Sequence, residues 1–339
     1  MKKMKHVLLS LPVALGLLFF LGPRPHYPAF DGKLPSVTWP LAELDSIIGA
    51  REAAVPGLKP DNQARVVWAD SIRKTPYSIV YLHGFGASPM EGAPAHLDFA
   101  GRYHCNLYLP RLPQHGIDDP ESFRAVSPKD WIDAAKEALA IGRLLGEKVI
   151  LMSCSTGCTL SIYLAAERPE LVDALILYSP NIALADPAAE LLTYPWGLQA
   201  ARMIVGEYRT VPSFIGWEAE KYWTVTYRTE GLVALKTLME ETMQPEYFRK
   251  IRQPLFLGYY YKSEEEQDDV VSVEAMKHFF EQASTPPHLK RMQAFPGAQT
   301  HIIPSGLFSK DIPAVQEATC RFAEEVLGLV PRSSWHRRQ

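Results

Sequence analysis

The feature that most constrains how this chain can fold is an alternation of short apolar runs with longer helical patterns, which begins near residue 63. Two of these runs, 77–82 and 148–152, consist mostly of Val, Ile, Leu, Met and Tyr. Strands of this composition are buried on both faces, as in parallel sheets that helices cover. The alternation therefore predicts an α/β fold with a mostly parallel, doubly wound sheet and helices on both faces.

The alternation also predicts where the individual elements lie. Strands are expected at 65–69, 78–82, 106–109, 148–152, 174–178, 254–261 and 289–295. Helices are expected at 90–102, 128–145, 156–167, 273–283 and 311–327. A chain of 339 residues, 47% of them hydrophobic, can bury one core of this size. We assign 63–183 and 251–328 to one body, and 329–339 to a C-terminal tail.

One stretch, about 184–250, interrupts the alternation. It joins the strand that ends near 178 to the strand that begins at 254, and it is far longer than an ordinary connection in such a sheet. It contains several short helical patterns and many aromatic residues: Tyr194, Trp196, Phe214, Trp217, Tyr222, Trp223 and Tyr227. We interpret it as an inserted helical cap over the strand ends. Most of these aromatic residues are expected to attach the cap to the body, and a few to face a pocket.

A strand, a tight turn and a helix follow one another around Ser155. The predicted strand 148–152 runs directly into Ser153-Cys154-Ser155-Thr156-Gly157 and then into a helical pattern. A nucleophile elbow requires small residues two positions before and after the nucleophile, because the chain doubles back there. Ser153 and Gly157 occupy these positions, with Ser153 in place of the usual first glycine. Ser155 is thus a candidate nucleophile near a helix N-terminus; the alternative is a serine that only caps the helix.

A second turn, His83-Gly84-Phe85-Gly86, ends another apolar strand. Glycines let the backbone approach a substrate closely, and the amides of Phe85 and Thr156 could donate hydrogen bonds to an anionic tetrahedral oxygen. The two glycines also begin a dinucleotide-binding pattern, but Pro89 stands where the third glycine would be. No cofactor is required by the chemistry that this turn suggests.

A nucleophilic serine needs a base, and the base needs an orienting acid. Of the ten histidines, His301 is best placed, in a loop between the last predicted strand and the last predicted helix. Asp268 follows the strand at 254–261, which gives the chain order Ser, Asp, His with each residue on its own loop at one sheet edge. Asp269 and Glu266 remain alternative acids, because this loop is long. His301 as a surface histidine and 264–269 as a solvated acidic loop are the structural alternatives.

With these motifs the chain resembles the α/β-hydrolase superfamily, and most closely its compact serine esterases and lipases that carry His-Gly-Phe at the oxyanion loop and a helical cap. The resemblance covers about residues 63–328. It implies these roles: nucleophile Ser155, general base and then acid His301, orienting acid Asp268, and oxyanion-hole amides of Phe85 and Thr156. The expected function is hydrolysis of small-molecule carboxylic esters through an acyl-enzyme. A serine peptidase or amidase, and a non-catalytic binding protein of the same fold, are the alternatives.

Charge and cysteine content exclude other classes. Lys and Arg number 35 against 38 Asp and Glu, so there is no electrostatic case for nucleic acid as a partner. Four scattered cysteines exclude a disulfide scaffold and provide no zinc-site spacing. We expect no metal, and we expect His83 and His115 to be structural or pocket-lining. Cys154 and Cys158 are expected to be buried thiols, although they could pair after export, and Trp131 is expected in the core.

The N-terminus has the pattern of an export signal. Lys2, Lys3 and Lys5 precede an apolar run over 7–22. As a helix this run would be about 24 Å long, shorter than the roughly 30 Å hydrocarbon core of a bilayer. We therefore expect 1–22 to be a signal peptide or an uncleaved membrane anchor, with 23–62 as a linker and N-terminal extension, and the body to be periplasmic, extracellular or membrane-anchored. A buried N-terminal helix is a third possibility.

Overall fold

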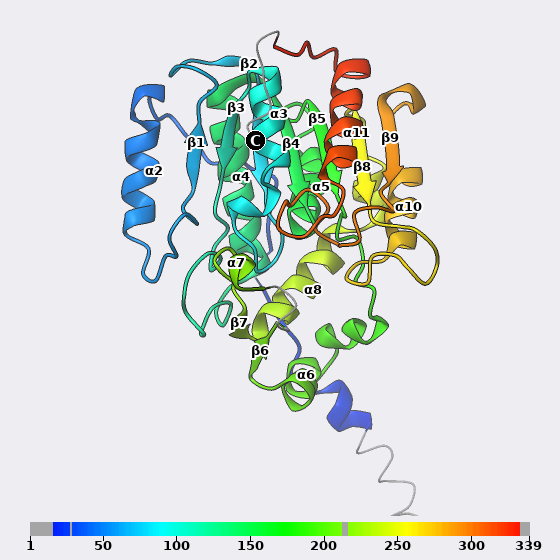
Figure 1. Cartoon of the computed structure of the whole chain (residues 1–339). Coiled ribbons are helices and arrows are strands. Elements are labelled where there is room, and N and C mark those ends of the chain that lie inside the picture. Colours follow the sequence, from blue (N-terminus) through cyan, green and yellow to red (C-terminus); the bar gives the residue numbers. More distant parts are fainter. Residues whose placement is uncertain (1–15, 28, 212–215, 333–339) are drawn as a thin grey trace, which may run out of the picture.

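The computed structural model describes residues 16–27, 29–211 and 216–332. Its centre is a seven-stranded sheet in the order β1-β3-β2-β4-β5-β8-β9, in which β1 is antiparallel to β3 and every other pair is parallel (Figure 1). The strands are β1 Arg65–Val67, β2 Thr75–Leu82, β3 Asn106–Leu109, β4 Gly146–Cys154, β5 Ala174–Tyr178, β8 Leu255–Tyr259 and β9 Lys290–Ala294. The predicted α/β fold is confirmed.

Both faces of the central strands are buried, as their composition predicts. In β2, Val80 and Leu82 belong to one core cluster, whereas Ile79 and Tyr81 belong to a second cluster on the opposite face. Side chains alternate across a strand, so each central strand supplies both cores. Helices α4 Pro128–Leu145, α5 Thr156–Glu167 and α10 Val273–Gln282 cover the first face, and α3 Ala95–Tyr103 and α11 Ile312–Glu325 cover the second.

Helix boundaries follow local capping signals. Helix α4 begins as predicted, because Ser127 Oγ accepts the Asp130 N–H while the Asp130 carboxylate accepts the Ser127 N–H. The helix expected at 90–102 begins later, at Ala95. Residues Pro89–Gly92 form a 3₁₀ turn instead, and Pro94 precedes the helix because proline lacks the N–H that a continuous helix would use.

The segment 23–62, interpreted as a linker, contains a helix. Helix α2 (Leu44–Ala53) follows the 3₁₀ turn Leu41–Glu43 and buries Leu44 and Ile48 in the first core. The Trp68 Nε1 donates to Asp45 at 2.8 Å, which attaches α2 beside β1. With only two buried positions, this helix has a weak amphipathic pattern, so sequence periodicity did not predict it.

The insertion between β5 and β8 contains strands as well as helices. Its elements are the 3₁₀ helix η3 Pro187–Thr193, α6 Gly197–Val205, β6 Tyr208–Thr210, α7 Gly216–Glu220, β7 Thr226–Arg228, α8 Glu230–Thr242 and α9 Pro245–Phe248. Strands β6 and β7 pair antiparallel, so the insertion is not purely helical as expected. Figure 1 shows α6, β6 and β7 at the lower end of the molecule, with α7 above them, just below the sheet. Helix α8 packs on α4 and α5 and shares the first core.

The aromatic residues of the insertion fall into two groups. Trp223 and Tyr227 are buried, whereas Tyr194 and Trp196 are exposed to solvent; Tyr222, between these groups, is half-buried. Phe214 and the side chain of Trp217 lie outside the described part of the structure. Residues 1–15 of the predicted export segment also lie outside it. Among the residues that are described, no helix combines the length and apolarity needed to cross a membrane.

Candidate active site

Parallel pairing brings the candidate site residues to one edge of the sheet. Strands β2, β4, β5 and β8 are in register near their carboxyl ends, where Leu82 pairs with Ser153 and Cys154 pairs with Tyr178. The turns that follow β2 and β4 and the loops that follow β8 and β9 therefore emerge side by side. This edge is where open α/β sheets carry their ligand sites.

Ser155 lies at the apex of the turn between β4 and α5, in a strained conformation. Its φ of 53° and ψ of −120° are unusual for a residue with a side chain. Its N–H donates to the Tyr178 carbonyl at 3.0 Å, which holds the turn against β5. At Gly157, a Cβ would lie 1.9 Å from the Leu82 carbonyl oxygen. Only glycine lets the helix leave the turn so close to β2.

The serine at the elbow's first small position is accommodated by hydrogen bonds. The buried Ser153 hydroxyl accepts from the Ser161 hydroxyl at 3.0 Å and donates to Cys158 Sγ at 3.4 Å. A buried hydroxyl without partners would destabilise the fold, so these contacts explain why serine can replace glycine here.

His301 and Asp268 are adjacent. His301 Nδ1 lies 2.7 Å from Asp268 Oδ2, and Asp268 Oδ1 accepts the N–H groups of Val270 and Val271 at 3.0 and 3.1 Å. Burial alone lowers the pKa of His301, but the charge and hydrogen bond of Asp268, together with the charge of Glu91, raise it above its ordinary value. His301 Nε2 is buried without a hydrogen-bond partner among the described residues, so it is open to a group in the cavity.

The two alternative acids lie elsewhere. Asp269 is exposed, and Glu266 is exposed and paired with Lys262 at 2.7 Å. The loop turns so that the Asp268 N–H donates to the Tyr260 carbonyl at 3.2 Å, which directs this residue inward while its neighbours face solvent. Asp268 is therefore the carboxylate that the fold brings to His301.

The two predicted oxyanion donors line the same cavity as Ser155. Within the described residues, the N–H groups of Phe85 and Thr156 donate no hydrogen bond. The Phe85 ring packs in an aromatic cluster, with its centroid 4.7 Å from that of Phe123 and 5.3 Å from that of Tyr227. Anchoring the ring fixes the backbone of the loop, so that its amide is preorganised.

Both histidines near this loop are structural. His83 Nδ1 donates to the Gly84 carbonyl at 3.0 Å, and His83 Nε2 accepts the Leu112 N–H at 3.1 Å, so the ring is neutral. Burial lowers the pKa of His83 to about 4, and it lowers that of His115 well below the ordinary value. In the part of the chain that the structure describes, no group of His, Cys, Asp or Glu side chains could hold a metal ion.

Glu91 is a site residue that the sequence reasoning missed. It is buried beside the cavity, and its Oε2 accepts the Gly84 N–H at 2.9 Å and the Tyr81 O–H at 3.0 Å. Burial raises its pKa to about 7. A Cβ on Gly84 would lie 2.8 Å from Glu91 Oε1 and 3.1 Å from Ser155 Cβ, so the carboxyl and the serine flank this glycine. The only signal in the sequence was an acidic residue shortly after the His-Gly-Phe turn.

The cavity has a volume of about 220 Å³ and a mixed lining. Its polar wall contains Ser155, His301, Glu91, Thr156 and Asn181. Its apolar wall comes largely from the insertion and neighbouring loops: Leu184, Trp223, Tyr227, Leu232, Leu235, Val270 and Ile302. A reactive polar group that faces an apolar wall is typical of sites for small molecules with an apolar part.

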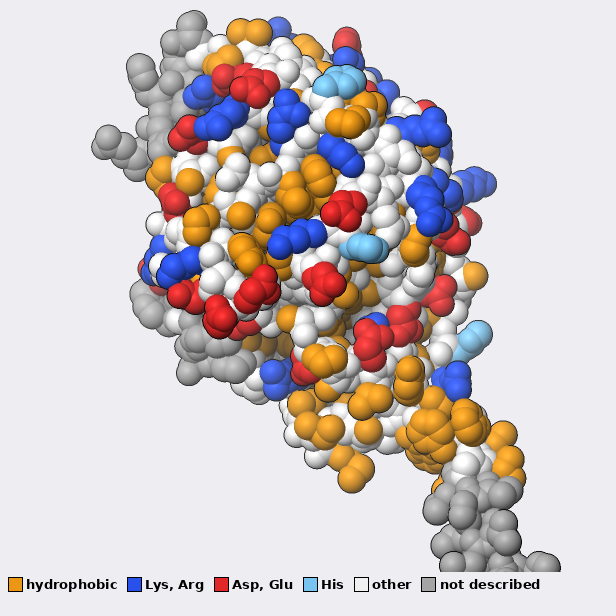
Figure 2. Space-filling view, turned by 90° about the vertical axis from the view of Figure 1, so that its right-hand side faces the viewer, with side chains coloured by type: hydrophobic (Ala, Val, Ile, Leu, Met, Phe, Trp, Pro, Cys, Tyr) orange, Lys and Arg blue, Asp and Glu red, His pale blue; other side chains and the backbone are white. Residues whose placement is uncertain are grey.

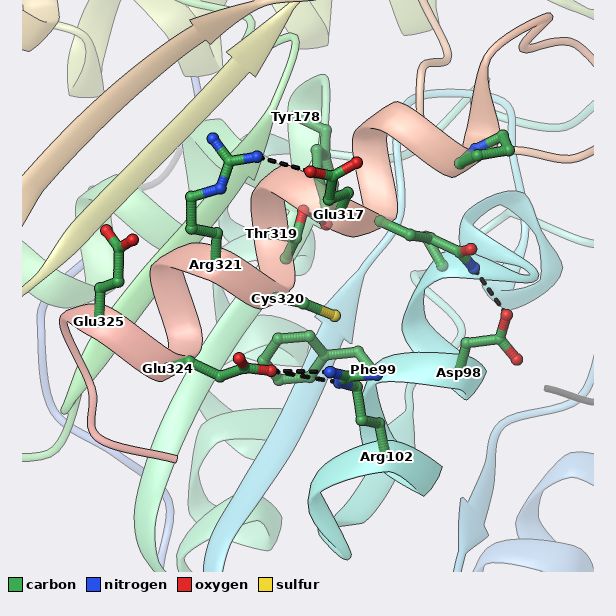
Figure 3. Close-up of a pocket in the computed structure, with 13 residues that line it drawn as sticks. Asp98, Phe99, Arg102, Tyr178, Glu317, Thr319, Cys320, Arg321, Glu324 and Glu325 are labelled. Carbon is green, nitrogen blue, oxygen red and sulfur yellow. Dashed lines mark hydrogen bonds and ion pairs between the residues drawn. The ribbon is translucent and has the colours of Figure 1, made fainter. Parts of the chain in front are cut away.

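A larger cavity, of about 440 Å³, lies between α3 and α11 and contains none of the predicted site residues (Figure 3). Most of its charged groups have partners: Arg102 pairs with Glu324, Arg321 pairs with Glu317, and Asp98 accepts a hydrogen bond from the Gln316 amide. These contacts engage most of the charged groups, and none of the predicted site residues lines this cavity, so the cavity at the strand ends is the better candidate for chemistry.

The cysteines and Trp131 behave as expected. Cys154 and Cys158 are free and buried, and burial raises the pKa of both thiols. They are therefore inert packing residues, not a disulfide. Trp131 is fully buried in the first core.

Fold and site together define a hydrolase of the α/β type, and sequence comparison agrees. Residues 79–306 match the profile of the Alpha/beta hydrolase family, and the chain belongs to that family. No curated protein matches the chain.

Solved structures with the same fold include enzymes that act on esters. One from the pair of metagenome-derived lipolytic enzymes LipS and LipT has a TM-score of 0.63 at 14% identity, over 78% of this chain and 98% of that chain. The monoacylglycerol lipase of Paleococcus ferrophilus has a TM-score of 0.57 at 14% identity, over 76% and 96%. Est1E of Butyrivibrio proteoclasticus, with ferulic acid bound, has a TM-score of 0.54 at 17% identity, over 78% and 95%. At these identities the likeness shows the fold.

Proposed function

We propose that this protein is a serine hydrolase that cleaves carboxylic esters through an acyl-enzyme on Ser155. The observation that carries the proposal is that Ser155 and His301 line the same cavity. Ser155 lies at the apex of a strained elbow, and the Nδ1 of His301 is hydrogen-bonded to Asp268. A nucleophile, a base and an orienting acid in this arrangement are what acyl transfer requires.

Each residue has a defined part in the proposed reaction. Ser155 Oγ attacks the ester carbonyl carbon while His301 Nε2 takes its proton, and the N–H groups of Phe85 and Thr156 stabilise the oxyanion. Collapse of the tetrahedral intermediate breaks the bond to the alkoxy oxygen, which receives the proton from His301. Water, deprotonated by His301, then attacks the acyl-enzyme; the bond to Ser155 Oγ breaks, His301 returns the proton to that oxygen, and the acid is released. Asp268 keeps the imidazole oriented and stabilises its charged form throughout.

The lining of the cavity supports esters with a moderately apolar part. Trp223, Tyr227 and Leu235 face the polar wall across a space of about 220 Å³, which suits a small acyl or alcohol group. The esterase and lipase structures that share this fold are in keeping with such substrates.

We infer further that residues 1–22 direct export, either as a cleaved signal or as an anchor. The support is the order of three lysines followed by an apolar run over 7–22. Cell fractionation tests this proposal, with the size of the protein in each fraction compared with that of the full-length chain. A body that stays in the cytoplasm at full length contradicts it.

Labelling with a fluorophosphonate probe, followed by hydrolysis of p-nitrophenyl esters of increasing chain length, tests the proposed function. The wild type is expected to be labelled and to release p-nitrophenol, whereas Ser155→Ala does neither. A wild type that is not labelled, or equal labelling of Ser155→Ala, overturns the proposal. Labelling with cleavage of aminoacyl anilides but no ester turnover would assign the site to amides instead.

A matched pair of variants tests the acid. Asp268→Asn is expected to lower kcat by roughly four orders of magnitude, because the amide holds His301 in the wrong tautomer. Asp269→Asn, one position along and exposed, is expected to keep wild-type kcat. Equal effects of the two substitutions would remove Asp268 from the proposed mechanism.

A further inference from the structure

Large apolar side chains are exposed together at one end of the molecule. They come from residues 17–21 and from the insertion, and the five from the insertion are Leu191, Tyr194, Trp196, Met203 and Ile204. Each of these side chains is at least 38% exposed. We call this surface the apolar end. Figure 2 shows hydrophobic side chains gathered there, whereas charged residues are spread over the body above.

Two separate segments build the apolar end, and they touch. The Trp196 Nε1 donates to the Leu18 carbonyl at 3.1 Å, and the Trp196 N–H donates to the Pro23 carbonyl at 2.9 Å. The Trp196 ring also closes over Gly22, since a Cβ there would lie 2.0 Å from its Nε1. These contacts hold the end of the N-terminal apolar run against the insertion.

Helix α6 presents its apolar side outward. Ala201 is buried, and Arg202 pairs with Glu230 of α8 at 2.7 Å, which holds the helix on the molecule. Met203 and Ile204 are 88% and 81% exposed at its end. Transfer of apolar side chains of this size out of water is favourable. Their adjacent exposure therefore indicates a surface that another molecule or surface covers when the protein functions.

We propose that, in the chain that keeps residues 1–22, the apolar end docks on the surface of a lipid bilayer. The chain itself points to this occupant: residues 7–15, which precede the described part, continue the same apolar run toward Lys2, Lys3 and Lys5. This run has no polar face and is continuous with the apolar end. Its insertion into a bilayer would therefore bring the apolar end to the bilayer surface. Trp196 and Tyr194 suit the interface between lipid and water, because one end of each ring is polar.

Two other occupants are possible for an apolar surface, and the experiment separates them. A second copy of the chain would bury Met203 and Ile204 in a dimer without lipid. Residues 7–15 could instead fold back over the surface of their own chain. Of these three alternatives, only docking on lipid makes the burial of the Trp196 ring depend on added vesicles.

The test uses the full-length chain and vesicles of equal parts phosphatidylcholine and phosphatidylglycerol. Replacing both exposed aliphatic residues of α6, in Met203→Glu/Ile204→Glu, is expected to lower vesicle partitioning by about tenfold, because two charges would enter the interface. The matched control is Ile72→Glu/Val330→Glu, since Ile72 and Val330 are 51% and 81% exposed but lie outside the apolar end. The control pair is expected to partition like the wild type.

Brominated lipids add a readout that folding defects do not mimic. Vesicles of such lipids are expected to quench part of the wild-type fluorescence, and Trp196→Phe is expected to lose that part while still binding. Equal partitioning of the two double variants, or no quenching attributable to Trp196, overturns the proposal. So does a lipid-free dimer in light scattering that Met203→Glu/Ile204→Glu dissolves. The outcome is independent of whether Ser155 is reactive.

Discussion

Two buried carboxyl groups act on His301 from different elements. Asp268 accepts the His301 ring hydrogen and two backbone N–H groups, while Glu91 accepts the Gly84 N–H and the Tyr81 O–H. Burial raises the pKa of Glu91 to about 7, and the charge of His301 opposes that rise. Glu91 therefore changes charge near neutral pH, directly beside the candidate oxyanion loop.

Glu91→Gln removes this charge but keeps an oxygen that can accept both hydrogen bonds. The folded-state pKa of Glu91, about 7, exceeds the ordinary 4.5, so ionisation disfavours the native state as pH rises between these values. We therefore compare the free energy of unfolding of the wild type with that of Glu91→Gln at each pH. Between pH 5 and pH 8, the wild type is expected to lose about 2 to 3 kcal/mol relative to the variant. Urea unfolding at both pH values measures it. The exposed Glu241→Gln should show no such trend, and a pH-independent difference for Glu91→Gln would contradict the assignment.

At the scale of elements, the turn between β4 and α5 depends on contact between backbones. Gly157 places the first turn of α5 against the end of β2, with no room for a Cβ beside the Leu82 carbonyl. The same contact sets the direction in which Ser155 and the Thr156 N–H face. A substitution at Gly157 thus changes both the packing of two elements and the geometry of the site.

Gly157→Ala is expected to destabilise the fold by about 2 kcal/mol or more and to abolish fluorophosphonate labelling, because the added methyl group forces β2 and α5 apart. Gly49→Ala is the matched control. A Cβ at Gly49, within α2, meets nothing within 4 Å, so alanine is expected to stabilise that helix by about 0.5 to 1 kcal/mol. Thermal unfolding and labelling rates measure both effects. Wild-type labelling of Gly157→Ala would show that the turn tolerates a side chain.

At the scale of the whole molecule, the insertion is attached to the body at the candidate oxyanion loop. The Thr224 N–H donates to the Gly86 carbonyl at 2.6 Å, and Lys59 Nζ donates to the Trp223 carbonyl at 2.8 Å. The Trp223 ring packs edge-on against Phe308, with 5.1 Å between ring centroids. The insertion therefore closes the cavity above Ser155 and determines its depth.

Trp223→Ala is expected to lengthen the cavity and shift the preference toward longer acyl chains. The ratio of kcat/KM for a longer to a shorter p-nitrophenyl ester should rise by roughly tenfold, which is typical when a pocket gains space for a few methylene groups. Tyr194→Ala, also an aromatic residue of the insertion but exposed, should leave the ratio unchanged. If both variants keep the wild-type ratio, Trp223 does not limit the substrate.

Local signals allowed much of the fold to be predicted from the sequence. The bounds of α4 and α5 agree with the prediction, because a capping box precedes one helix and the Ser155 turn precedes the other. Strand-like runs between the helical patterns indicated all seven strands of the main sheet, including β9, which is not continuously apolar. The candidate residues Ser155, Asp268 and His301 could be named because their order and their positions after strands are properties of the chain.

Only the tertiary structure distinguished between chemically similar residues. Asp268 and Asp269 are adjacent in the sequence, and the turn of one loop buries the first and exposes the second. Glu91 became a site residue because packing removes its carboxyl from water beside Gly84. The apolar end arises where residue 18 meets Trp196, far apart in the chain. Periodicity, caps and turns are local and can be read from the sequence, whereas burial depends on which distant segments meet, and burial sets the pKa of Glu91 and the exposure of the apolar end.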